Sequence, residues 1–166
     1  VTKKPWALTG AAGRRANCIR SLLLANGELE EHNLQLQRKY KLIARREITC
    51  EKIGTADCDL LIVAYGTSAR IAKGAMAQAR AMGIRVGVLR PITLWPFPSA
   101  AVAKIAARCR AVLVVEMSSG QMIEDVRLAV NGKRPVYFEG RMGGGVPEEE
   151  DVLLAIRRAL KKKKKK

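Results

Sequence analysis

Residues 59–87 read DLLIVAYGTSARIAKGAMAQARAMGIRVG and contain one complete structural unit. The apolar run 60–64 is short, branched and uninterrupted, which is typical of a strand buried on both faces. A break at 65–68 precedes a helical pattern that runs to Met82 and ends at the glycine after it, where a left-handed cap would sit. A second apolar run begins at Ile84. The stretch therefore predicts a β-turn-α-β unit.

The turn in this unit is a candidate anion-binding site. Backbone N–H groups at the start of a helix have no helical partner, and the helix dipole is positive there. The candidate residues are Gly66, Thr67, Ser68 and Arg70. The alternative is that the turn binds nothing, because every α/β domain has such turns and a single glycine is a weak signal.

The same pattern repeats along the chain. Apolar runs begin at Leu60, Ile84, Ala111 and Pro135, with centres about 25 residues apart and helical patterns between them. This alternation predicts an α/β fold with a mainly parallel sheet and helices on both faces. The loops that follow the strands then gather along one edge, where ligands of such sheets bind.

The helix boundaries also have sequence signals. Ser99 is the predicted N-cap of the helix between the second and third strands, and Ser118 or Ser119 of the next one. Pro147 is predicted to open the last helix, with acidic residues at 148–151 in its first turn.

Residues 28–46 are charged and helical, with an apolar stripe of Leu29, Leu36, Tyr40 and Ile43. This helix either packs one edge on the domain or bridges to a neighbouring domain or subunit. We expect an arm and linking helix at 1–50, the α/β domain at 51–160 and a disordered Lys tail at 161–166.

The chain is strongly basic. Its 166 residues carry 31 basic and 15 acidic side chains, and without the six terminal lysines 25 basic residues still give a net charge of +10. This favours an anionic ligand or an acidic protein partner, while the 4% aromatic content makes nucleic acid an unlikely partner.

The sequence has no run of ~18 apolar residues and no signal-peptide core, so we expect no membrane span and a cytoplasmic location. The missing initial Met indicates a processed or excised piece.

No catalytic or metal-binding motif is found. The four cysteines, Cys18, Cys50, Cys58 and Cys109, show no C-x-x-C spacing and are expected to be buried free thiols. The one histidine, His32, lies in a charged segment and is expected at the surface. Neither a P-loop nor a G-x-G-x-x-G turn is present. Composition and spacing thus predict an α/β domain with an anionic or protein partner, and no metal.

Two later loops supply candidate interface residues. Residues 90–98, RPITLWPFP, are stiff and apolar, and either fold back onto the domain or form a docking surface. Glu116 ends a buried strand and is expected to accept hydrogen bonds from loop amides. The interface candidates are Arg90, Leu94, Trp95, Phe97, Glu116 and Gln121.

Four motifs carry a resemblance to a known family. They are VAYGTSAR at 63–70, LRPITLWPFP at 89–98, VEMSSGQM at 115–122 and GRMGG at 140–144. In this order they closely resemble the carboxy-terminal part of the alpha subunit of 2-oxoacid:ferredoxin oxidoreductases, with the 2-ketoisovalerate and 2-oxoglutarate enzymes nearest. The resemblance implies a transketolase C-terminal-like fold, a three-layer α/β/α sandwich with a mostly parallel sheet of about five strands and one antiparallel edge strand.

The resemblance also implies a reaction. Such enzymes oxidatively decarboxylate a 2-oxoacid to an acyl-coenzyme A with thiamine pyrophosphate and Mg, and pass electrons through iron–sulfur clusters to ferredoxin. The implied partners are a thiamine-binding beta subunit, a gamma subunit and a ferredoxin-like delta subunit. The thiamine-pyrimidine domain would precede residue 1, the diphosphate motif belongs to another subunit, and no cysteine set here suits a cluster. We therefore expect no catalytic residue and no cofactor held by this chain alone.

Three hypotheses follow. The chain is an assembly domain of such an enzyme, with coenzyme A contact at the turn; or it is a stand-alone anion-binding, nucleotide-binding or regulatory module; or it is the related domain of a transketolase or dehydrogenase E1-beta. The stretch 94–98, LWPFP, favours the ferredoxin-linked group over the third.

Overall fold

The computed structural model describes residues 4, 7, 10–16 and 21–161. The chain divides into two compact units, residues 1–40 and 41–166. Lys161 is the last residue of the final helix, and the rest of the predicted Lys tail lies outside the described residues, as does Cys18.

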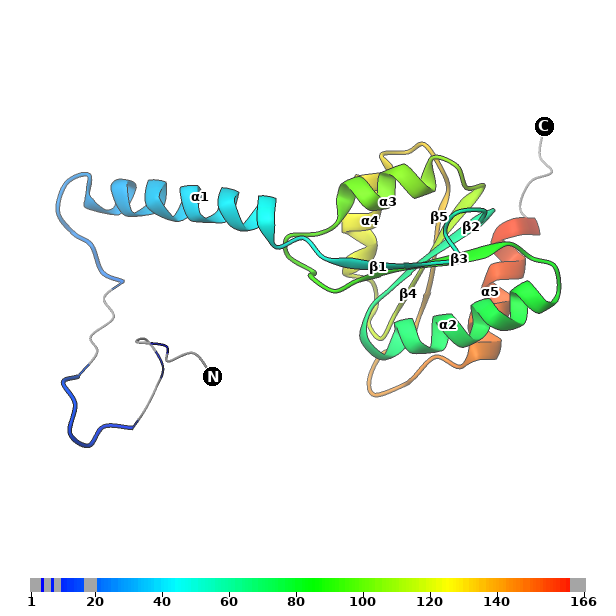
Figure 1. The fold of residues 1–166 in the computed structure, drawn as a ribbon, viewed down its shortest axis with the longest axis horizontal. Coiled ribbons are helices and arrows are strands. Elements are labelled where there is room, and N and C mark those ends of the chain that lie inside the picture. Colours follow the sequence, from blue (N-terminus) through cyan, green and yellow to red (C-terminus); the bar gives the residue numbers. More distant parts are fainter. Residues whose placement is uncertain (1–3, 5–6, 8–9, 17–20, 162–166) are drawn as a thin grey trace. The chain divides into compact units, whose positions relative to one another are not determined.

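The second unit contains a five-stranded sheet in the order β1-β3-β2-β4-β5 (Figure 1). The strands β2 (Leu60–Ala64), β3 (Val86–Pro91), β4 (Ala111–Glu116) and β5 (Val136–Gly140) are parallel, and β1 (Cys50–Ile53) pairs antiparallel with β3. The mostly parallel sheet with one antiparallel edge strand is confirmed.

Helices cover both faces of the sheet. The helices α2 (Gly66–Ala81) and α5 (Glu149–Lys161) lie on one face, and α3 (Ser99–Ala106) and α4 (Met122–Val130) lie on the other (Figure 1). Side chains of β2 alternate between the two resulting cores, so Leu60 and Ile62 join the first, and Leu61 and Val63 the second. The three-layer α/β/α sandwich is confirmed.

The first β-turn-α-β unit is close to its prediction. Helix α2 ends at Ala81 with Met82 as its C-cap, and Gly83 after it has the expected left-handed φ of +78°. Its start differs, because Tyr65 is the N-cap and the helix already begins at Gly66, whose φ of +55° favours glycine. The predicted break at 65–68 is thus a tighter connection.

The serine caps were predicted wrongly. Ser99 is the first residue of α3, with Pro98 at the N-cap. Helix α4 begins after both predicted serines, and its first turn is capped from a distance by a buried carboxylate. The backbone N–H groups of residues 121–123 donate to the Glu116 carboxylate at 2.9–3.1 Å. This confirms the prediction that Glu116 accepts loop amides, and a carboxylate at a helix N-terminus also complements the dipole.

Helix α1 (Glu28–Arg46) has the predicted bounds and no buried residue. Its Leu29 and Tyr40 are exposed, and Leu36 and Ile43 are half-buried.

We predict that Gly87→Ala destabilises the domain by about 1–3 kcal/mol because it overpacks a tight contact. A Cβ at Gly87 would lie 2.7 Å from the Gly54 carbonyl oxygen and 3.0 Å from Cys58 Sγ, in backbone that cannot move aside easily. Urea unfolding of the two proteins measures the difference.

Gly74→Ala is the matched control. A Cβ there meets only the exposed, flexible Glu149 carboxylate, and alanine favours the helix by about 1 kcal/mol over glycine. Equal unfolding midpoints for the two variants would contradict the close approach at Gly87.

Candidate functional site

A cavity of about 240 Å³ opens at the carboxyl edge of the sheet, where β2 and β3 end. It is lined by Gly66, Ala69, Arg70, Lys73 and Arg90, and we call it the basic cleft. Because β2 and β3 are parallel neighbours, the start of α2 and the end of β3 lie at the same edge. The fold thus brings together residues separated by about one β-α unit in sequence.

The spacing of two basic residues along α2 brings both of their side chains to the cleft. Arg70 and Lys73 follow Gly66 by four and seven residues, so they lie on one face of α2. The first turn of α2 has no acidic residue. Unpaired N–H groups, the positive end of the helix dipole and three basic side chains therefore meet at one opening, a combination that suits phosphate or carboxylate groups.

One carboxylate faces two of these basic groups. Glu51 Oε2 lies 2.9 Å from Lys73 Nζ and 3.2 Å from an Arg90 guanidinium nitrogen. The β1–β3 register places Glu51 directly beside Arg90. The side chains of all three are more than a third exposed, so these ion pairs contribute little stability and can be exchanged for a ligand.

The hydrogen bond from Lys73, followed by that from Arg90, holds the pKa of Glu51 below its ordinary value of 4.5. Because the pKa of Glu51 is lower in the folded protein than in the unfolded chain, its ionised form stabilises the fold at a pH above 4.5. This stabilisation is lost as the pH falls below 4.5 and through the lowered pKa of the folded state. Glu51 is therefore ionised at neutral pH, and an anion would have to displace it from Lys73 and Arg90. Arg70 has no ion pair among the described residues.

The predicted turn residues separate into two groups. Gly66 and Arg70 line the cleft, and the interface candidate Arg90 lines it too. Thr67 is exposed but is not a lining residue, and Ser68 is buried, with 3% of its surface exposed.

The 90–98 loop has one side on the domain and one side in solvent. Phe97 packs against the core under α3 and α4, while Leu94 and Trp95 are 44% and 61% exposed. Thr93 closes the loop, because its hydroxyl donates to the Pro96 carbonyl at 3.1 Å. The loop therefore folds back onto the domain through Phe97, whereas docking by Leu94 and Trp95 stays a prediction.

The Glu116 side chain is fully buried, so it cannot contact a partner protein directly. Gln121 is exposed at the N-cap of α4.

Sequence reasoning missed two residues of the site. Lys73 could have been found, since it lies seven residues after Gly66 on the same helix face. Glu51 could not, because its place beside Arg90 depends on the pairing of a short antiparallel strand.

Among residues 4, 7, 10–16 and 21–161, no group of three or more histidine, cysteine or acidic side chains could hold a metal ion. The same residues bring only two thiols together, whereas an iron–sulfur cluster takes four ligands, so a cluster does not fit this part of the chain. No described helix is long and apolar enough to cross a membrane.

Comparison with protein families matches residues 58–152 to "Pyruvate:ferredoxin oxidoreductase core domain II". The chain is 45% identical over 143 residues to ketoisovalerate oxidoreductase subunit VorB of Methanothermobacter marburgensis, covering 86% of this chain and 40% of that protein. It is 33% identical over 113 residues to 2-oxoglutarate synthase subunit KorA of the same organism, covering 66% of this chain and 30% of that protein. The chain thus spans less than half the length of these relatives.

Two solved structures share the fold. A 2-oxoglutarate:ferredoxin oxidoreductase from Magnetococcus marinus, solved with 2-oxoglutarate, coenzyme A and succinyl-CoA bound, superimposes with a TM-score of 0.69 at 23% identity, covering 81% of this chain and 24% of that chain. An inactive beta4 tetramer of a split-gene transketolase gives a TM-score of 0.58 at 22% identity, covering 68% of this chain and 41% of that chain. The resemblance drawn from the motifs is confirmed.

We predict that Glu51→Gln strengthens pyrophosphate binding to the cleft about threefold, and that Arg70→Ala weakens it by a similar factor. The first change frees Lys73 and Arg90 from a competing carboxylate, and the second removes a cation from the lining. Calorimetric titration at neutral pH measures both affinities. Glu124→Gln on α4 is the control, since this exposed carboxylate pairs with Arg127 outside the cleft. Weaker binding by Glu51→Gln would contradict the site.

Proposed function

The chain belongs to the pyruvate:ferredoxin oxidoreductase core domain II family, and we propose that it is a domain of the alpha subunit of a 2-oxoacid:ferredoxin oxidoreductase. The higher identity to ketoisovalerate oxidoreductase subunits, 45% against 33% for a 2-oxoglutarate synthase subunit, favours a branched 2-oxoacid as substrate. The proposed reaction is oxidative decarboxylation of the 2-oxoacid to its acyl-coenzyme A in the cytoplasm.

The chemistry would be supplied outside this chain. Thiamine pyrophosphate with Mg, and the iron–sulfur clusters, would be held by other subunits or domains, namely the thiamine-binding beta, gamma and ferredoxin-like delta subunits, with ferredoxin as the final acceptor. Two observations support this division: the described residues have no metal-binding group, and the one histidine is exposed on α1. We therefore expect no 2-oxoacid turnover by the isolated chain.

The proposed role of this domain is to contact coenzyme A and partner subunits. The observation that carries it is the basic cleft, because coenzyme A is rich in phosphate and the cleft presents three cations at a helix N-terminus. Arg70, Lys73 and Arg90 would bind the phosphates. Leu94 and Trp95 are exposed apolar groups on the next loop, and they would contact a partner subunit.

A stand-alone anion-binding or regulatory module is the second candidate. The observation in its favour is that residues of this chain alone line the cleft. Such a module would bind a nucleotide as a monomer and would not change the kinetics of a 2-oxoacid oxidoreductase.

In the complete enzyme we predict that Arg70→Ala raises the KM for coenzyme A about three- to tenfold and leaves kcat nearly unchanged, because the lost contact acts in the bound state and the transition state alike. Steady-state kinetics with coenzyme A varied and the 2-oxoacid saturating measure this. Glu51→Gln is expected to shift the KM in the opposite direction. Lys104→Ala is the matched control, an exposed cation on α3, a helix on the other face of the sheet. An unchanged KM in both cleft variants would contradict coenzyme A contact.

A further inference from the structure

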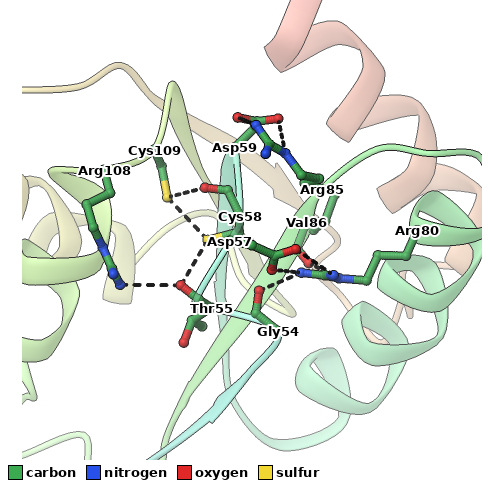
Figure 2. Close-up of polar contacts among 10 residues, drawn as sticks. All are labelled: Gly54, Thr55, Asp57, Cys58, Asp59, Arg80, Arg85, Val86, Arg108 and Cys109. Atoms are coloured by element: carbon green, nitrogen blue, oxygen red, sulfur yellow. Dashed lines mark hydrogen bonds and ion pairs between the residues drawn. The ribbon is translucent and has the colours of Figure 1, made fainter.

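Two thiols, Cys58 and Cys109, meet at the amino edge of the sheet (Figure 2). The basic cleft lies at the opposite, carboxyl edge. Cys58 lies just before β2 and Cys109 just before β4, and their Sγ atoms are 3.3 Å apart. Both side chains are buried, with 6% and 2% of their surfaces exposed. The prediction of buried free thiols is confirmed for this pair, whereas Cys50 is half-buried.

The strand register explains why they meet. Leu60 and Ala111 are partners in the parallel pairing of β2 with β4. Cys58 lies two residues before Leu60, and Cys109 lies two residues before Ala111. Continuation of that register places Cys58 opposite Cys109. The thiol pair is therefore fixed by the most buried pairing of the sheet.

Arginines hold the backbone around the pair. Arg80 donates to the Gly54 carbonyl at 2.7 Å and pairs with Asp57 at 2.7 Å, which fixes the loop that carries Cys58. Arg108 donates to the Thr55 carbonyl at 3.4 Å (Figure 2). Arg134 donates to the carbonyl of Cys109 at 2.6 Å. These contacts keep the two sulfur atoms close together in the reduced protein.

The same surroundings differentiate the two thiols. The hydrogen bond from Cys109, with the nearby charges of Arg108 and Arg80, lowers the pKa of Cys58. The shared hydrogen bond and burial raise the pKa of Cys109. Cys58 is therefore the more acidic thiol of the pair, and thiolates are the nucleophiles in thiol oxidation.

We propose that Cys58 and Cys109 form a reversible disulfide within the domain when the protein meets a peroxide. A disulfide has an S–S bond of about 2.05 Å, so the sulfurs must approach by about 1.2 Å from their reduced separation. The pair is complete in this chain and needs no partner subunit. The proposal is independent of coenzyme A binding, since the basic cleft lies at the other edge of the sheet.

The oxidation balances with hydrogen peroxide as the oxidant. The Cys58 thiolate attacks one peroxide oxygen, the O–O bond breaks, and the products are a sulfenic acid and hydroxide, which takes up a proton to become water. The Cys109 sulfur then attacks the Cys58 sulfur. The S–S bond forms, the S–O bond breaks, and the leaving hydroxide takes the Cys109 proton and departs as water. In total two thiols lose two electrons and two protons, and one peroxide becomes two waters.

The bond would join residues 51 apart in sequence. It would close a loop that contains β2, α2, β3 and α3, and a closed loop restricts the unfolded chain. We expect the oxidised domain to unfold at a higher urea concentration than the reduced one. Neither residue lines the basic cleft, so anion binding is expected to stay within twofold of its reduced value.

The test treats the full chain with an equimolar amount of hydrogen peroxide, blocks the remaining thiols with an alkylating reagent, and maps peptides without reduction by mass spectrometry. We expect a peptide pair linking Cys58 to Cys109 that is two hydrogens lighter than its reduced parts, and its loss after dithiothreitol. Wild-type protein suffices for this measurement, so the result does not depend on the folding of a variant.

Two variants sharpen the result. Cys50→Ser keeps all contacts of the pair and is expected to give the same linked peptide. Cys109→Ala is expected to leave Cys58 as a sulfenic acid that dimedone traps. The proposal is wrong if Cys50 becomes oxidised while Cys58 and Cys109 remain unlinked, or if Cys58 links mainly to Cys50 or Cys18.

Discussion

The burial of β2 and β4 on both faces is the constraint on which this structure depends. Every residue of these two strands is buried, and their backbone groups pair with strands on either side. Apolar side chains on both faces require a helical layer above and below the sheet. Along β2 and β4, polar side chains are therefore found only where the strands begin and end.

The two edges carry different chemistry because the strands are parallel. At the carboxyl edge, helix α2 begins with free N–H groups, and the cations of α2 and β3 surround a cavity. At the amino edge, arginines bind loop carbonyls and carboxylates, and two thiols stand opposite each other in the register of β2 and β4. Glu116, at the carboxyl end of β4, shows what a buried charge needs, because three backbone N–H groups and the Ser118 hydroxyl satisfy it.

The sequence predicted the buried strands and their helices well, because an apolar run of five residues followed by a helical period has few other structural solutions. It did not reveal β1, whose four residues, CEKI, carry two charges and no clear alternation, and only the family resemblance implied an antiparallel edge strand. Gly66 and Arg70 were predicted from local signals, whereas Glu51 and the thiol pair depend on register between distant segments. The serine caps predicted for α4 failed because the Glu116 carboxylate, which precedes these residues by 5 to 7 positions in sequence, accepts from the same N–H groups.

The proposed function puts this domain inside a 2-oxoacid:ferredoxin oxidoreductase. Its most direct test is affinity purification of the tagged protein from its native cells under anaerobic conditions, followed by mass spectrometry of the co-purifying chains. We expect a thiamine-binding subunit and an iron–sulfur subunit in constant ratio to this chain, and turnover of a 2-oxoacid by the purified assembly. Purification of a monomer that binds nucleotide and lacks both subunits would contradict it.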